Sequence, residues 1–393
     1  MMARLGDICE VLNGYAFKSE KYTSSGVRII RIANVQKGYI EDTAPAFYPI
    51  DTTDIEKYTL YEDDLLISLT GNVGRVALLK KEFLPAALNQ RVACLRLKDS
   101  ARYDKSFLYC FLNSDYFENK CIQSAKGVAQ KNMSTEWLKE YQIPNLSLEE
   151  QKEIAAVLNK ISELISARTM QLQKLDELVK SRFIEMFGML NVNNKNWPQK
   201  SLGQACEQIK RYPTFCNMEY LQSGVRVIRI GNILLDGHLD TSDENYVFVY
   251  ENANSDYPDT VIEENDIIMA VRGDGSAAKR IGIVTEPKLI GANISPNLIR
   301  IKAKKEMLVS LFLFYYLTGE VGQARLDAFV NKTAKKNIAA KDIVKVITPI
   351  PPIQLQREFA AFVEQVDKSK LAIQQSLEKL ETLKKALMQQ YFG

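Results

Sequence analysis

Two stretches of equal length determine how this chain is organised. Residues 151–188 read QKEIAAVLNKISELISARTMQLQKLDELVKSRFIEMFG, and residues 356–393 read QREFAAFVEQVDKSKLAIQQSLEKLETLKKALMQQYFG. Aligned without gaps at an offset of 205 residues, they are identical at twelve of 38 positions. In both, the apolar residues recur at steps of three and four, which is typical of a long helix with one apolar stripe. A single helix of roughly 55 Å needs a partner for that stripe. We therefore expect the two helices to pair as an antiparallel coiled coil.

The segments before the two helices repeat as well. The matching pairs are residues 5–10 with 202–207, 25–34 with 223–232, 64–67 with 266–269, and 130–133 with 335–338. The offset drifts from 197 to 205 between these pairs, so insertions lie in loops while the framework is kept. The chain is therefore one module used twice.

Each module is expected to mix strands and helices. Gly, Asn and Asp interrupt its β-type runs, as turns would. These runs are Val27–Ile32, Leu65–Leu69, Val92–Leu97, Val225–Ile230, Ile267–Val271 and Leu298–Ile301, and the helix-like blocks are Phe107–Leu112 and Leu311–Leu317. The sequence predicts an α/β (α+β) chain with pseudo-two-fold organisation. Its parts are a globular domain at 1–149, a central helix at 150–188, a linker at 189–199, a second globular domain at 200–354 and a C-terminal helix at 355–393.

Composition excludes several classes of protein. The 393 residues carry a net charge of +3, which is too mild to indicate nucleic acid by itself. The longest apolar stretch, about 309–317, is too short to span a membrane, and residues 1–10 hold no signal-peptide core. We therefore expect a cytoplasmic protein. The six cysteines form no CxxC pair, and His238 is the single histidine, in a predicted Asp-Gly-His hairpin turn. We expect no metal site and no cofactor in this chain.

Signatures of catalysis are mostly missing. The chain has no Walker loop, no GxSxG and no strand-linked GxGxxG. Asp259, Glu286 and Lys288 resemble a nuclease string that could hold magnesium. The first module has Glu56-Lys57 and Leu84-Pro85-Ala86 at the equivalent positions, so the duplicated unit does not share the string. Ordinary loop acids are the better interpretation, and no catalytic residue is expected.

Polar loops between the strands are the remaining candidates for function. Arg, Lys, Asn and Gln reach base edges in the major groove of DNA, and Lys, Ser and Thr contact phosphate. Each loop alone also fits a solvated turn, but the loops recur at matching positions of the repeat. The candidate DNA-binding residues are Asn34, Thr70, Asn72, Arg75, Asn89, Gln90, Lys126, Gln130, Lys131, Asn132, Asn232, Arg272, Ser276, Lys279, Arg280, Asn293, Lys332, Lys335, Lys336 and Asn337.

Taken together, the pattern resembles the specificity (S) subunit of type I restriction–modification enzymes over essentially the whole chain. The resemblance is carried by Leu5-Gly6-Asp7, Gly26-Val27-Arg28, Gln130–Met133 with its twin Lys335–Ile338, the run from Ile143-Pro144 to Ile154, and the twin helix from Gln356. The second copy departs at its helix entry, where residues 349–355 are shorter and richer in proline.

The resemblance implies a division of labour. Each globular part would be a target-recognition domain that reads one half of an asymmetric bipartite site in double-stranded DNA, and the coiled coil would space the halves. Two methyltransferase (M) subunits, which supply S-adenosylmethionine and adenine-N6 chemistry, and two endonuclease/translocase (R) subunits would complete the complex. The alternatives are a nuclease, the specificity portion of a related restriction–methylation enzyme, and a coiled-coil scaffold that binds protein.

Overall fold

The computed structural model describes residues 2–50, 53–125, 132–211, 219–271, 280–331 and 337–392. The chain forms two compact units. Unit 1 comprises residues 1–171 and 373–393, and unit 2 comprises residues 172–372. Each unit therefore holds one globular module together with a part of each long helix.

Unit 1 builds its module from two four-stranded sheets and a short strand pair. One sheet has the order β2-β9-β6-β7, the second has the order β4-β3-β8-β5, and β1 pairs with β10. The strands are β1 Met2–Arg4, β2 Cys9–Asn13, β3 Val27–Ile30, β4 Phe47–Tyr48, β5 Thr59–Leu60, β6 Leu65–Ser68, β7 Val76–Leu78, β8 Ala86–Leu88, β9 Val92–Leu97 and β10 Gln142–Pro144. The short helices are α1 Leu5–Ile8, α2 Lys105–Leu112, α3 Asp115–Ser124 and α4 Thr135–Glu140.

Unit 2 repeats this topology, with one strand fewer in its second sheet among the described residues. Its sheets have the orders β12-β18-β15-β16 and β14-β13-β17, and β11 pairs with β19. The strands are β11 Gln199–Ser201, β12 Cys206–Arg211, β13 Val225–Ile228, β14 Val247–Val249, β15 Ile267–Ala270, β16 Ile281–Ile283, β17 Asn293–Ile294, β18 Leu298–Ala303 and β19 Ile347–Pro349. The short helices are α6 Leu202–Ala205, α7 Ala253–Asp256, α8 Ser310–Thr318, α9 Glu320–Asp327 and α10 Ala340–Ile343. The order of strands in the main sheet is thus the same in both units, as the sequence repeat predicted.

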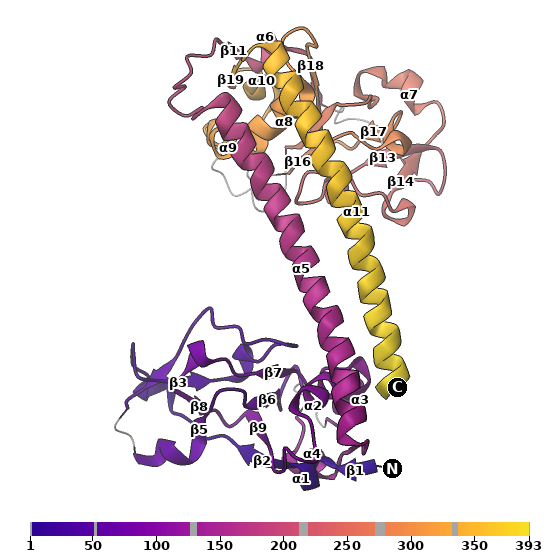
Figure 1. Ribbon diagram of the computed structural model, residues 1–393. Coiled ribbons are helices and arrows are strands. Elements are labelled where there is room, and N and C mark those ends of the chain that lie inside the picture. The colour runs from indigo at the N-terminus through magenta and orange to yellow at the C-terminus, as the bar shows by residue number, and fades with distance from the viewer. Residues whose placement is uncertain are drawn as a thin grey trace. The chain divides into compact units, whose positions relative to one another are not determined.

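The two long helices are α5, Leu148–Phe187, and α11, Ile353–Phe392. Both begin two residues earlier than expected, and α5 ends directly before Gly188, which has a positive φ of 78°. In unit 1, the start of α5 and the end of α11 lie beside α2 and α3 (Figure 1). In unit 2, the end of α5 packs on the start of α11, where the Phe183 and Phe359 rings are 5.3 Å apart. Within each unit the helices therefore run antiparallel, as predicted.

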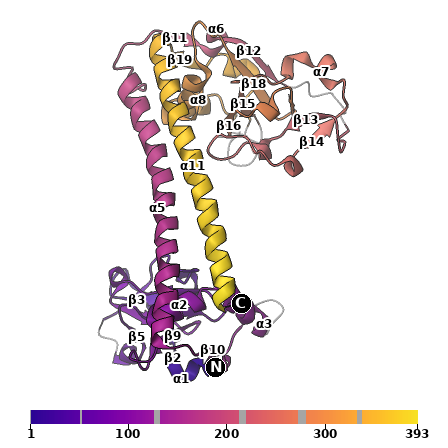
Figure 2. The same ribbon diagram turned by 45° about the vertical axis from the view of Figure 1, so that its right-hand side comes forward.

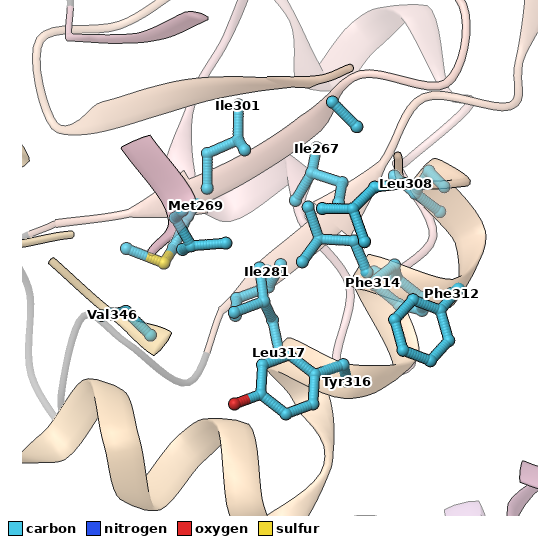
Figure 3. Close-up of a cluster of buried hydrophobic side chains, with 14 of the residues drawn as sticks. Ile267, Met269, Ile281, Ile301, Leu308, Phe312, Phe314, Tyr316, Leu317 and Val346 are labelled. Carbon is cyan, nitrogen blue, oxygen red and sulfur yellow. The ribbon is translucent and has the colours of Figure 1, made fainter. Parts of the chain in front are cut away.

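The core of unit 2 lies between its main sheet and α8 (Figure 2). Ile267, Met269, Ile281 and Ile301 point from the strands toward Phe312 and Tyr316 of α8, among the buried side chains labelled in Figure 3. Phe187 and Phe359 of the long helices belong to the same cluster and are fully buried. The helices are therefore part of each module's core, and much of their stability comes from it.

The structure also shows the surroundings of the cysteines and of His238, and it shortens one predicted strand in each unit. Cys9, Cys94, Cys110, Cys121 and Cys206 are free and buried, while Cys216 lies outside the described residues. His238 sits in a hairpin turn closed by a bridge between Ile233 and Leu239. The predicted strand Val27–Ile32 ends early, at Ile30, because the chain turns into a 3₁₀ helix at Ile32–Asn34. The same happens after Ile228 in unit 2, where the helix spans Ile230–Asn232.

A buried glutamine fastens each long helix to its module. The Oε1 atom of Gln151 accepts from the backbone N of Asp104, at the N-cap of α2, at 2.9 Å. Its Nε2 donates to the Leu146 carbonyl at 2.9 Å and to the Arg102 carbonyl at 3.3 Å. The side chain has no exposed surface. All three groups would lose a partner without it.

Gln356 makes the same three bonds in unit 2. Its Oε1 accepts from the backbone N of Val309, the N-cap of α8, at 2.9 Å. Its Nε2 donates to the carbonyls of Pro351 and Met307 at 2.8 and 3.0 Å. The two glutamines are aligned in the sequence repeat, so this junction is a framework feature of the module.

We predict that Gln356→Leu destabilises unit 2 by about 2–3 kcal/mol, because it leaves one buried donor and two carbonyls without partners. The measurement is the urea dependence of unfolding, followed by circular dichroism. Gln354→Leu is the matched control, since Gln354 is exposed on the same helix two residues away. Equal effects of the two substitutions would contradict the role assigned to the buried amide.

Candidate nucleic-acid interface

Loops from four parts of unit 1 meet at one end of its main sheet. The register places Asn13 opposite Ala93, and Ser68 opposite Val92. The segment after β2, the β6–β7 loop and the β8–β9 turn therefore emerge side by side. The backbone N of Met133 donates to the Leu69 carbonyl at 2.8 Å, which adds the segment before α4. We define rim 1 as residues 14–15, 69–75, 89–91 and 132–133.

Unit 2 forms the equivalent edge with the same backbone bonds. Leu69 N donates to Arg91 O in unit 1 at 3.0 Å, and Val271 N donates to Asn297 O in unit 2 at 2.9 Å. The backbone N of Ile338 donates to the Val271 carbonyl at 3.3 Å. We define rim 2 as the described residues Val271, Arg280, Ser295–Asn297, Asn337 and Ile338.

The structure thus brings many of the predicted residues together. Rim 1 gathers Thr70, Asn72, Arg75, Asn89, Gln90 and Asn132, and rim 2 gathers Arg280 and Asn337. Nine predicted residues lie outside the described part of the chain, namely Lys126, Gln130, Lys131, Arg272, Ser276, Lys279, Lys332, Lys335 and Lys336.

The two ends of the main sheet differ in charge. Rim 1 contains Arg75 and Arg91 and no carboxylate, while Glu62, Asp63 and Asp64 cluster at the opposite end, before β6. In unit 2, residues 263–266, which include three acidic side chains, occupy that opposite end before β15. The rim therefore presents fewer carboxylates to a polyanion than the opposite end does.

The acidic end has a structural function in both units. Arg96 binds both carboxylate oxygens of Asp64, at 2.8 and 2.7 Å. The Nε atom of Arg300 donates to Asp266 at 2.6 Å, and both side chains are only 3% exposed. Burial raises the pKa of Asp266, against the opposing hydrogen bonds from Glu263 and Arg300. Removing either partner would leave a buried charge, so these pairs hold the sheet rather than a ligand.

The rim arginines Arg75 and Arg280 are anchored at equivalent places. Arg75 donates to the Gln36 side-chain oxygen and lies 3.2 Å from the amide oxygen of Asn72. Arg280 donates to the carbonyls of Ile230 and Ile233 at 3.3 and 3.2 Å. Each therefore stabilises the turn that follows β3 or β13. Both remain partly exposed and retain donors for a ligand.

Three of the predicted asparagines have buried side chains whose amides form hydrogen bonds within the fold. Asn34 accepts from Arg31 N at 2.9 Å and donates to the Glu41 carbonyl and Asp42 at 2.8 and 3.0 Å. Asn232 closes the same turn in unit 2, through Arg229 N and the Asn245 carbonyl. The third, Asn293, donates to Asn254 and to the Tyr257 carbonyl, and is 1% exposed. Their amides are used by the framework, and DNA contact by them stays a prediction.

Two exposed residues of rim 1 were missed by sequence reasoning. Arg91 is exposed, and its guanidinium has no hydrogen-bond or ion-pair partner within the described residues. Tyr15 is 38% exposed, and its ring packs at 5.1 Å from Phe17 and 5.2 Å from Tyr58. The sequence could have indicated Arg91, because it directly follows the candidates Asn89 and Gln90. No local sequence pattern indicates Tyr15.

Two of the three nuclease-like residues form ion pairs with other side chains. Asp259 pairs with Lys210 at 2.9 Å and accepts from Gln208, while Lys288 pairs with Asp243 at 3.4 Å. Across the described ranges, no cluster of three or more His, Cys, Asp or Glu side chains could hold a metal ion. None of the helices in these ranges is long and apolar enough to cross a membrane.

Comparison with known proteins is informative over nearly the full length. The family model for the type I restriction modification DNA specificity domain matches residues 1–177 and 189–384. The chain is 24% identical over 343 residues to the MjaVIII specificity subunit of Methanocaldococcus jannaschii, covering 83% of this chain and 77% of that protein. It is 39% identical over 168 residues to the EcoAI specificity subunit of Escherichia coli, covering 41% of this chain and 28% of that protein.

A solved structure shares the fold. The S subunit of a type I restriction–modification system from M. genitalium has a TM-score of 0.60 at 17% identity, with 100% of this chain and 96% of that chain covered.

We predict that Asn34→Ala lowers the stability of unit 1 by roughly 1–3 kcal/mol, because it leaves the Arg31 amide and the Glu41 carbonyl without partners. Gln90→Ala is the control, because this exposed side chain forms no hydrogen bond with the framework within the described residues, and its loss is expected to change stability by no more than about 0.5 kcal/mol. Chemical unfolding measures both. If Asn34→Ala leaves the free energy of unfolding unchanged, the framework role assigned to Asn34 is wrong.

Proposed function

The chain belongs to the family of type I restriction–modification DNA specificity subunits, and on this premise we propose that rim 1 and rim 2 each read one half of a bipartite DNA site. The observation that carries the proposal is the position of the rims. Each module collects its variable polar loops at one sheet end, with the acidic turn at the other end. Side chains suited to base edges and phosphates lie at that end in both units.

The two half-sites are expected to differ. The framework repeats down to single hydrogen bonds, as the twin glutamines and the twin aspartate–arginine pairs show. The rims do not repeat, because Asn89-Gln90-Arg91 in unit 1 is replaced by Ser295-Pro296-Asn297 in unit 2. Modules with one scaffold and different contact residues would recognise different bases, which gives an asymmetric site.

The long helices are proposed to set the distance between the half-sites and to dock the methyltransferase subunits. Each helix has 40 residues, or about 60 Å of length. Half-sites one turn of DNA apart are separated by roughly 34 Å, so a helix of this length is long enough for that task. Exposed apolar residues on the helices, such as Val157, Leu178 and Leu383, support docking of partner proteins.

The chain is proposed to act without catalysis of its own. Two methyltransferase subunits would bring S-adenosylmethionine and transfer a methyl group to adenine N6, and two endonuclease/translocase subunits would cleave unmodified DNA. This chain needs no cofactor for recognition. The complex would work in the cytoplasm, on double-stranded DNA.

The direct test is to express the chain together with its methyltransferase partner in a host that lacks DNA methylation. Sequencing of the methylated genome should reveal N6-methyladenine in one split motif, and only when this chain is present. A stable complex that leaves the genome unmethylated would overturn the proposal and favour a protein-binding scaffold. Magnesium-dependent cleavage by the purified chain alone would instead favour the nuclease alternative.

Replacing residues 1–149 with the corresponding module of another family member should change one half of the methylated motif and leave the other half intact. The physical reason is that rim 1 lies entirely within these residues. The reciprocal exchange of residues 200–354 is the control and should change only the other half. A change in both halves from a single exchange would contradict independent reading by the two modules.

A further inference from the structure

We propose that Arg91 reads a guanine in the half-site recognised by unit 1, and that Tyr15 packs against the adjoining nucleotide. The inference deepens the proposed function and rests on it. It concerns two residues that share one corner of rim 1, where the backbone N of Gln90 donates to the Tyr15 carbonyl at 2.9 Å.

The backbone that carries Arg91 is fixed from several sides. Its carbonyl accepts from Leu69 N at 3.0 Å, and its own N lies 3.5 Å from the Asn89 side-chain oxygen. Val92, the next residue, is fully buried and donates to the Asn89 carbonyl at 2.9 Å. A side chain that starts from so rigid a turn loses less freedom on binding than one on a loose loop.

The Arg91 side chain differs from every other described arginine of unit 1. Seven of them contact other groups of the unit through their side chains, namely Arg4, Arg28, Arg31, Arg75, Arg96, Arg102 and Arg168. Among the described arginines of unit 1, Arg91 alone has neither an acceptor, a carboxylate nor an aromatic ring as partner. The Arg91 side chain is exposed and lies on rim 1, which contains no carboxylate.

The chemistry of the guanidinium favours guanine over other bases. Its planar fork donates two parallel hydrogen bonds, which match the O6 and N7 acceptors of guanine in the major groove. The neighbouring Gln90 is also exposed and offers an amide, the group that pairs with adenine. Arg91 and Gln90 thus supply two different base-reading groups in consecutive positions.

Tyr15 supplies a rigid apolar wall at the same corner. Its ring is held against Phe17 and Tyr58. Gly14 is required beside it, because a Cβ at this position would lie 2.1 Å from the Asn89 carbonyl oxygen. The segment therefore packs directly on the turn that carries Arg91. An aromatic ring held this way offers contact area to a sugar or base at low entropic cost.

The test compares Arg91→Ala and Arg91→Lys in the complex with the methyltransferase partner, with the methylated motif and methylation rates as readouts. We expect discrimination at one guanine of one half-site to fall about 5- to 150-fold in both variants, since lysine lacks the fork. The other half-site should be unchanged. Arg102→Ala is the matched control, an exposed arginine of unit 1 near the acidic end of the sheet. Tyr15→Ala should lower the rate on the cognate site while complex formation persists.

The outcomes separate the inference from the proposed function. If the unaltered complex methylates a split motif and both Arg91 variants keep that motif, the inference is wrong and the proposed function stands. Uniform weakening on all sequences, rescued by lysine and with a shallower salt dependence, would assign Arg91 to a phosphate and also overturn it. If the unaltered complex methylates nothing, the proposed function falls and the inference falls with it.

Discussion

The arrangement depends first on the hydrogen bonds of two buried glutamines. Apolar packing alone would tolerate small rotations of a helix against its module, because dispersion contacts have little directionality. The side chain of Gln151 or Gln356 binds one donor and two acceptors from two separate segments, including the N-cap of α2 or α8. A buried network of this kind has one satisfied geometry. The angle at which each long helix leaves its module is therefore fixed by directional bonds.

The same division between fixed and variable parts runs through each module. The strands pair through backbone groups, and an arginine clamps the acidic turn before β6 or β15, the partly buried Arg96 in unit 1 and the buried Arg300 in unit 2. Neither feature uses the residues of the rims. Because the rims lie at the other end of the sheet, their side chains can change without cost to the clamp or to the glutamine junction. A protein whose targets must diversify while its partners stay the same benefits from such a separation.

Sequence reasoning predicted the fold, whereas three of its candidate contact residues have amides that the framework uses. Helical periodicity located α5 and α11 within two residues at their starts, and the repeat gave the duplicated modules. Polarity alone could not separate an asparagine that closes a turn from one that faces solvent, so Asn34, Asn232 and Asn293 entered the candidate set. The Arg-x-x-Asn spacing shared by Arg31 and Arg229 was the clue to a framework role. The position of Arg91 after Asn89-Gln90 was a weak signal in the sequence, and the structure adds that its guanidinium, unlike those of the other described arginines of unit 1, has no partner.

The net charge of +3 fits a protein that recognises particular bases better than one that binds DNA of any sequence. Non-specific affinity grows with the number of phosphates that a surface neutralises. In rim 1, Arg75 is engaged by Gln36, which leaves Arg91 as the described arginine with an uncommitted guanidinium. One or two cations contribute little to non-specific binding, yet one bidentate contact supplies about 1–3 kcal/mol of discrimination. Such a rim favours the correct bases without holding incorrect DNA tightly.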